Sequence, residues 1–120
     1  MLTVKRLDHI LISVPPDTRE AARTFYGEVL QWEEIPGDHP RGAIWFRTGD
    51  IELHIREEAS HNDSSDRHAA FEVENLDEVK RFLTAQQVDI AYSTPINGRD
   101  RCFFRDPWGN RFELLAYAGL

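Results

Sequence analysis

The sequence contains one cysteine, Cys102, among its 120 residues. An internal disulfide is therefore excluded, and a lone thiol beside Phe103 and Phe104 is typical of a buried, inert side chain in a reducing compartment. No apolar run approaches the roughly 20 residues that a membrane-spanning helix needs. The first residues also lack the apolar core of a secretory signal. We therefore expect a soluble, cytoplasmic protein.

Positive charge is also scarce. The chain has 14 Lys and Arg against 21 Asp and Glu, which gives a net charge of -7. Nucleic acids and anionic membranes are bound through clustered Lys and Arg, so neither is expected as a partner. Apolar residues make up 41% of the chain, which suits one globular domain over residues 1–120.

The chain does contain a repeated order of elements. Apolar periodicity and turn residues predict strand, helix and three strands in a first half of about residues 5–57, and the same order in a second half of about 67–118. A polar connector of about 58–66 separates the halves. The predicted strands are 7–14, 32–35, 42–47, 51–56, 68–73, 89–93, 101–105 and 111–117, and the predicted helices are 19–30 and 76–88. This order indicates an α+β fold.

The last predicted strand carries a carboxylate, Glu113, directly after the turn Asp106–Asn110. Its neighbours Phe112 and Leu114 belong to the opposite face, because side chains alternate along a strand. A solvated strand face is the commoner explanation of a lone glutamate. The functional interpretation therefore depends on partners elsewhere in the chain.

Such partners occur at corresponding points of the two halves. His9 and His68 lie in the first strand of each half, 68 minus 9, or 59, positions apart. Glu52 shifted by 59 falls at position 111, one strand period before Glu113, so the face is preserved. In each strand these residues oppose the apolar face.

Two imidazoles and two carboxylates on matching faces form a plausible ligand set for a divalent transition metal. The predicted metal ligands are His9, Glu52, His68 and Glu113. His54 shares the face of Glu52 and could substitute for it or support it. His39 and His61 are interpreted as solvated loop residues.

The residues resemble the vicinal oxygen chelate superfamily, which includes glyoxalase I, methylmalonyl-CoA epimerase, fosfomycin-resistance proteins, extradiol dioxygenases and bleomycin-resistance proteins. The segments that carry the resemblance are 7–10, 25–30, 51–54, 68–73 and 106–113. They span nearly the whole chain.

The resemblance implies two βαβββ modules that form a half-open, eight-stranded, barrel-like sheet, often in a homodimer. It implies that His9, Glu52, His68 and Glu113 bind the metal, which would be Ni, Zn, Mn, Fe or Co. The four-ligand set is similar to that of glyoxalase I and favours lyase or isomerase chemistry on a small substrate with two neighbouring oxygens. Glu113 or Glu52 would move the proton of an enediolate-like intermediate.

Two departures concern the substrate. Where bacterial glyoxalase I typically places glutathione-binding Arg and Asn, this chain has Ser13 and Arg56. They weigh against a glutathione hemithioacetal. The alternative function is a non-enzymatic protein of the bleomycin-resistance type, which would sequester a planar cation against Trp45, Phe104 or Trp108.

Overall fold

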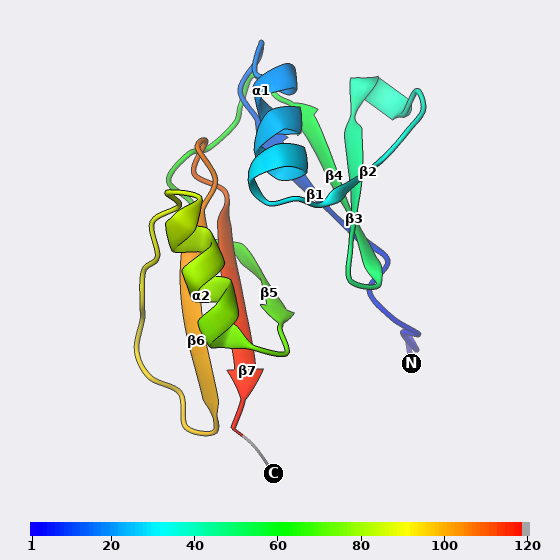
Figure 1. Ribbon diagram of the computed structural model, residues 1–120. Helices are drawn as coiled ribbons and strands as arrows, with labels where there is room; N and C mark the ends of the chain where they lie inside the picture. The colour runs from blue at the N-terminus through cyan, green and yellow to red at the C-terminus, as the bar shows by residue number, and fades with distance from the viewer. Residues whose placement is uncertain (119–120) are drawn as a thin grey trace. The chain divides into compact units, whose positions relative to one another are not determined.

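Seven strands form two sheets in the computed structural model, which describes residues 1–118 (Figure 1). Positions 119 and 120 of the predicted domain lie outside the described residues. The chain forms two compact units, Met1–His61 and a second one that begins at Asn62, so the division falls in the polar connector. Within residues 1–118, no helix has both the length and the apolar character required to cross a membrane.

The first unit contains a four-stranded sheet in the order β1-β4-β3-β2. Its strands are β1 (His9–Val14), β2 (Glu33–Ile35), β3 (Ile44–Thr48) and β4 (Ile51–Glu57). β1 is parallel to β4, and the other pairs are antiparallel. A two-residue turn joins β3 to β4, and Gly49 adopts a φ of 56° there, which glycine tolerates without steric cost.

The predicted helix 19–30 is helical over residues 19–29 but not uniform. It consists of α1 (Arg19–Thr24) followed by a π-helical turn, η1 (Phe25–Val29). Its apolar side is buried as the periodicity predicts, with Ala22, Phe25 and Tyr26 among the buried residues. Tyr26 packs on Phe46 of β3, with ring centroids 6.0 Å apart.

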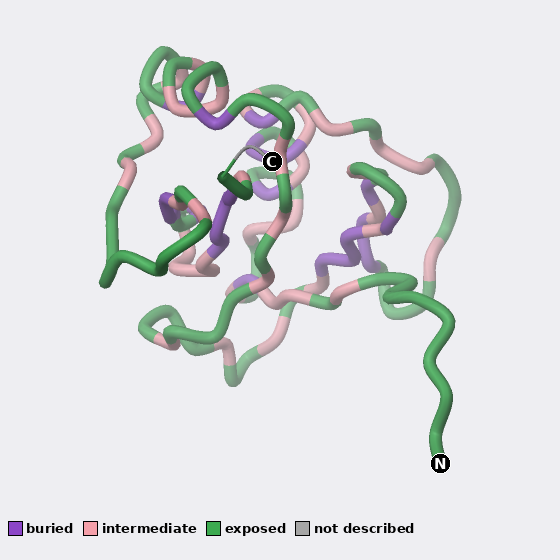
Figure 2. The backbone as a smooth tube through the Cα atoms, turned by 90° about the horizontal axis from the view of Figure 1, so that it is seen from below, coloured by how far each residue is buried: buried purple, intermediate pink, exposed green. Residues whose placement is uncertain are grey.

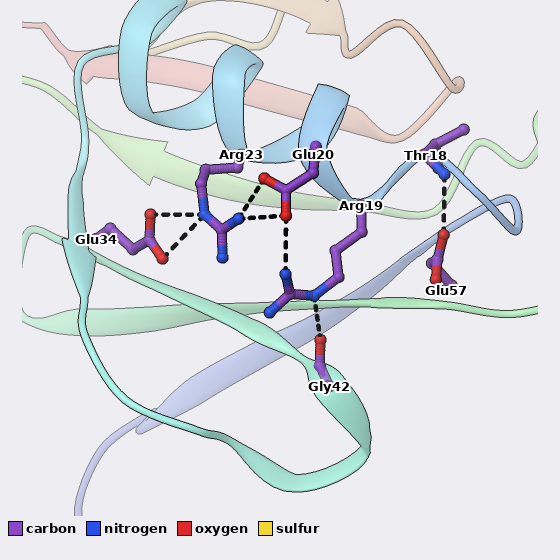
Figure 3. A network of polar contacts seen from close by, with 7 residues as sticks. All are labelled: Thr18, Arg19, Glu20, Arg23, Glu34, Gly42 and Glu57. Carbon is purple, nitrogen blue, oxygen red and sulfur yellow. Dashed lines mark hydrogen bonds and ion pairs between the residues drawn. The ribbon is translucent and has the colours of Figure 1, made fainter.

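Polar contacts connect α1 to its surroundings (Figure 3). Arg23 Nε donates to both carboxylate oxygens of Glu34 on β2, at 3.0 and 3.1 Å. Arg23 also pairs with Glu20, and this hydrogen bond lowers the pKa of the Glu20 carboxyl below its ordinary value. Thr18 N donates to Glu57 Oε2 at 2.9 Å, and Arg19 Nε donates to Gly42 O, the last residue of the short helix η2 (Pro40–Gly42), at 2.8 Å.

The second unit contains a three-stranded sheet in the order β5-β7-β6. Its elements are β5 (His68–Glu72), α2 (Leu76–Ala85), β6 (Arg99–Arg105) and β7 (Arg111–Tyr117). The predicted cap of α2 is confirmed, because Asn75 Oδ1 accepts a hydrogen bond from Glu78 N at 3.1 Å. The helix ends at Ala85, earlier than predicted, and Gln87 takes a positive φ of 62° just beyond it.

The predicted strand at 89–93 is wrong, so one strand of the expected eight is missing among residues 1–118. Only Ala91 pairs there, exchanging two 2.8 Å hydrogen bonds with Phe103. Residues 91–98 are all exposed, so this segment buries no apolar face that could extend the pairing.

Each unit has its own apolar core. Figure 2 shows the buried positions as short stretches of the chain separated by more exposed ones. Val14, Phe46, Leu53 and Ile55 are at most 1% exposed in the first unit. In the second unit the buried residues include Leu83, Cys102, Phe104, Phe112 and Leu114. The prediction that Cys102 is buried is confirmed, and burial raises the pKa of its thiol.

Candidate functional site

The turn before β7 fixes the start of the strand that carries Glu113. Asp106 accepts hydrogen bonds from the backbone N–H groups of Trp108 and Asn110 and from the Asn110 side chain, each at 2.9 Å. Gly109 adopts a φ of 89°, and a Cβ built there would lie 2.0 Å from Asp63 O. Only glycine therefore allows this turn to approach the connector backbone so closely.

Glu113 contacts His68 in the second unit. β5 and β7 are paired with Ala70 opposite Glu113, so His68 lies one strand period away on the same face. Its Nε2 lies 3.0 Å from Glu113 Oε1. The Glu113 side chain is 7% exposed and the His68 side chain 28%, so the pair is largely enclosed.

The other ring nitrogen of His68 is anchored by the backbone. Nδ1 lies 2.9 Å from Asp66 O. Because a carbonyl oxygen only accepts hydrogen bonds, Nδ1 carries the proton, and the lone pair of a neutral ring would point from Nε2 toward the carboxylate. Two interpretations of this contact follow. If the ring is protonated, it is an ion pair between an imidazolium and a carboxylate; if the ring is neutral, Nε2 and Oε1 are two ligand atoms that can bind the same cation.

In the first unit, His9 and Glu52 are register partners of β1 and β4. The imidazole that contacts Glu52, however, belongs to His54, whose Nε2 lies 3.0 Å from Glu52 Oε1. His9 Nδ1 donates to Asp8 Oδ2 at 2.9 Å, and this hydrogen bond lowers the pKa of Asp8. His54, predicted as a possible substitute, is thus the direct partner of Glu52.

Four rings are stacked in a column on this sheet. The centroid distances are 4.2 Å for His9–His54, 3.9 Å for His54–Trp45 and 4.0 Å for Trp45–His39, and neighbouring planes differ by at most 14°. The ring column places both faces of Trp45 against histidines. The imidazoles of His9 and His54 are thereby held in nearly parallel planes.

The interpretation of His39 and His61 as solvated loop residues is wrong. His39 is half-buried in the ring column, and its Nε2 lies 2.9 Å from Ile35 O. His61 Nδ1 lies 2.6 Å from Ser13 Oγ of β1. The position of these histidines in loops did not allow either contact to be predicted, because the partners lie 4 and 48 positions away in the sequence.

Sequence reasoning also missed an arginine beside each carboxylate. Arg47 Nη2 lies 3.8 Å from Glu52 Oε2, and Arg101 Nη1 lies 3.5 Å from Glu113 Oε1. The first pair could have been found from the Gly49–Asp50 turn, which sets Arg47 opposite Glu52. Arg101 has no such signal, because Phe103 is the register partner of Glu113.

The comparisons with known proteins agree with this architecture. The family model described as Glyoxalase/Bleomycin resistance protein/Dioxygenase superfamily matches residues 6–114. The chain belongs to this superfamily. A search of the curated proteins finds no match.

Several solved structures superimpose over nearly the whole chain. A glyoxalase family protein from Bacillus anthracis is 33% identical, with 98% of this chain and 99% of that chain covered and a TM-score of 0.88. A glyoxalase family protein from Enterococcus faecalis is 27% identical, with 92% and 97% covered and a TM-score of 0.75. The fosfomycin resistance protein of Listeria monocytogenes, 23% identical over 98% and 95% with a TM-score of 0.69, shares the fold.

Proteins of the glyoxalase superfamily commonly use divalent metals, and the donor pairs can be tested for that role. Two ligands about 2.1 Å from an ion and at right angles are about 3.0 Å apart. Both imidazole–carboxylate pairs have a 3.0 Å separation. The Nδ1 contacts of His9 and His68 are of the kind that orient metal-binding imidazoles.

Two features limit the fit. Within the described part of the chain, no group of three or more His, Cys, Asp or Glu side chains forms a metal-binding cluster. The Arg101 guanidinium also competes with any cation for Glu113 Oε1. The donor chemistry and spacing of each pair therefore suit a divalent ion, while the pairs themselves are incomplete sites.

Proposed function

We propose that the protein is a metal-dependent, glyoxalase- or epimerase-like lyase or isomerase that acts on a small substrate with two neighbouring oxygens. The proposed metal ligands are His9, Glu52, His68 and Glu113, with His54 as a possible substitute. One observation supports this proposal above all, the 3.0 Å contact between His68 Nε2 and Glu113 Oε1 with Nδ1 anchored to Asp66 O.

The bound ion would supply positive charge for an enediolate-like anion of the substrate. Glu113 and Glu52 are the carboxylates that can move the proton. Glu113 is the better candidate, because its side chain is 7% exposed against 27% for Glu52, and water competes less for an enclosed carboxylate. The contact with His68 Nε2 holds the Glu113 carboxylate in place, and this carboxylate would accept the proton.

Elemental analysis of metal-reconstituted protein tests this proposal. We expect at least one Ni, Zn, Mn, Fe or Co ion per wild-type chain and its loss in Glu113→Gln and His68→Ala. Glu72→Gln is the matched control, because Glu72 is exposed and lies on the same face of β5 as His68. Wild-type protein without bound metal after reconstitution would refute the proposal.

The bleomycin-resistance alternative has less support from the aromatic residues. Phe104 is 3% exposed and stacked on Phe112 at 5.2 Å, and both faces of Trp45 lie against histidines. Neither ring offers a face for a planar cation. Tight ligand binding without turnover and without metal would favour this alternative over the enzyme.

The proposal includes a cytoplasmic homodimer. The resemblance to glyoxalase I supports the dimer, and a single buried thiol supports the reducing compartment. Light scattering behind size-exclusion chromatography should give twice the mass of one chain, and the mass of one chain would contradict the dimer.

A further inference from the structure

One face of the sheet in the second unit is rich in arginine, although the chain as a whole is acidic. Strand alternation and register place Arg101 and Arg105 of β6 and Arg111 of β7 on the face that carries His68 and Glu113. The net charge of the chain is -7. A local excess of positive charge on this face is therefore not a consequence of composition.

Arg111 is the unusual member of this group. Its guanidinium carbon lies 4.0 Å from the centroid of the Phe103 ring, and within the described residues its side chain makes one hydrogen bond, a 3.5 Å contact to Asp66 O. Among residues 1–118 it has no carboxylate partner within ion-pair distance. Arg105, by contrast, is occupied by the Asp66 carboxylate and by the carbonyls of Ser65 and Gly109.

Arg101 adds a second guanidinium beside Glu113. It contacts Glu113 Oε1 at 3.5 Å and donates to Thr94 O, and its carbon lies 5.2 Å from the Phe103 centroid. Its Nε is buried and has no hydrogen-bond partner in the described part of the chain. Of the two guanidiniums over Phe103, only that of Arg101 has a carboxylate partner, so the charge of Arg111 is not balanced by an ion pair among residues 1–118.

A guanidinium packed over an aromatic ring keeps a fork of N–H groups that can donate two parallel hydrogen bonds to an oxyanion. Arg111 is the register partner of His68, so an anion bound to it would lie beside the proposed reaction site. We propose that Arg111, assisted by Arg101, binds a carboxylate or phosphate group of the substrate. This inference rests on the proposed function for the reaction and specifies its substrate class as anionic.

Arginine side-chain resonances of the metal-free protein test this inference. ¹⁵N-labelled protein is titrated with sodium phosphate or with sodium malonate at constant ionic strength set by chloride. We expect saturable shifts of the Nε–H signals of Arg111 and Arg101 with at least one of the two anions. If only one anion binds, the substrate group is identified as a phosphate or as a carboxylate. If both bind, the site recognises the oxyanion that the two groups have in common.

Matched variants separate a built site from a general charge effect. Arg111→Gln should raise the dissociation constant about tenfold or more, and Arg111→Lys should raise it less, because a lysine keeps the charge but not the fork of donors. Arg99→Gln is the control, since Arg99 occupies the same face of β6 and lies on the Tyr117 ring. Folding of each variant is checked by its thermal transition.

Two results would overturn the inference: no saturable shift with either anion, or equal weakening in Arg99→Gln and Arg111→Gln. A failure of the proposed function is distinguishable, because it appears as wild-type protein that binds no metal while the metal-free anion titration is unaffected. Loss of anion binding in Arg111→Gln with metal content unchanged is the expected combined result.

Discussion

The turn before β7 requires a residue without a Cβ at position 109. The φ of Gly109, 89°, is left-handed, and a Cβ would also lie 2.7 Å from the carbonyl carbon of Asp63. Gly98 adopts nearly the same φ, 88°, but a Cβ there would have nothing within 4 Å. The two glycines therefore separate backbone strain from steric exclusion.

We expect Gly98→Ala to lower the free energy of unfolding by about 1–2 kcal/mol, the usual cost of a left-handed conformation. Gly109→Ala should lower it by roughly 3 kcal/mol or more, because the connector backbone must also move. Urea unfolding of both variants measures the difference. Equal losses would show that the approach to Asp63 contributes nothing.

Trp45 illustrates how a side chain that does not bind metal can influence the proposed metal site. Its indole lies 3.9 Å from His54 and 4.0 Å from His39, nearly parallel to both. Trp45→Leu should weaken divalent metal binding about 10- to 100-fold, the usual effect of losing a residue that orients a ligand. Trp45→Phe should retain most of the affinity, because a flat ring remains.

Calorimetric titration with Zn²⁺ measures these affinities. Trp32→Leu is the matched control, since Trp32 packs on Tyr26 at 5.7 Å and has no part in the ring column. If Trp32→Leu weakens Zn²⁺ binding as much as Trp45→Leu, the ring column has no orienting role.

At the scale of elements, α1 is attached to its sheet by charges. Glu20 pairs with Arg23, which also binds Glu34 of β2 (Figure 3). The hydrogen bond from Arg23 lowers the pKa of Glu20 from its ordinary value of 4.5. A lowered pKa in the folded state adds stability above the unfolded pKa, and this stability is lost as the pH falls through the folded pKa.

We therefore expect wild-type protein to be more stable than Glu20→Gln at neutral pH, with the difference shrinking as the pH falls below about 4.5. Thermal unfolding of both proteins between neutral pH and pH 3 measures this difference. Glu33→Gln is a control, because Glu33 is an exposed glutamate of β2. A constant difference at all pH values would contradict the assignment.

Elements were predictable where a local signal determines them. The Gly49–Asp50 turn fixes the register of β3 with β4 and hence the pairing of Trp45 with His54. The prediction of a strand at 89–93 is wrong because the apolar residues of this segment follow the pattern of a strand although residues 91–93 are exposed. The π-helical turn after α1 has no sequence signal in the periodicity, since its buried residues keep the helical spacing.

At the scale of the whole molecule, the repeat explains why each unit has a histidine on its first strand and a glutamate on its last strand, but not which of these side chains meet: Glu113 contacts His68 of the paired strand, whereas Glu52 contacts His54 of its own strand. The histidines and glutamates follow from strand parity and the shift of 59 positions. The identity of the histidine that contacts Glu52, and the presence of Arg101, depend on side-chain directions that parity does not specify.

X-ray absorption of the zinc-loaded protein tests the proposed metal site most directly, because it identifies the atoms around the ion. We predict a shell of nitrogen and oxygen at about 2.0–2.2 Å with an imidazole contribution in the wild-type protein. This shell should be absent from His68→Ala, which is expected to lose the metal. A shell without imidazole, or sulfur at about 2.3 Å from Cys102, would contradict the account.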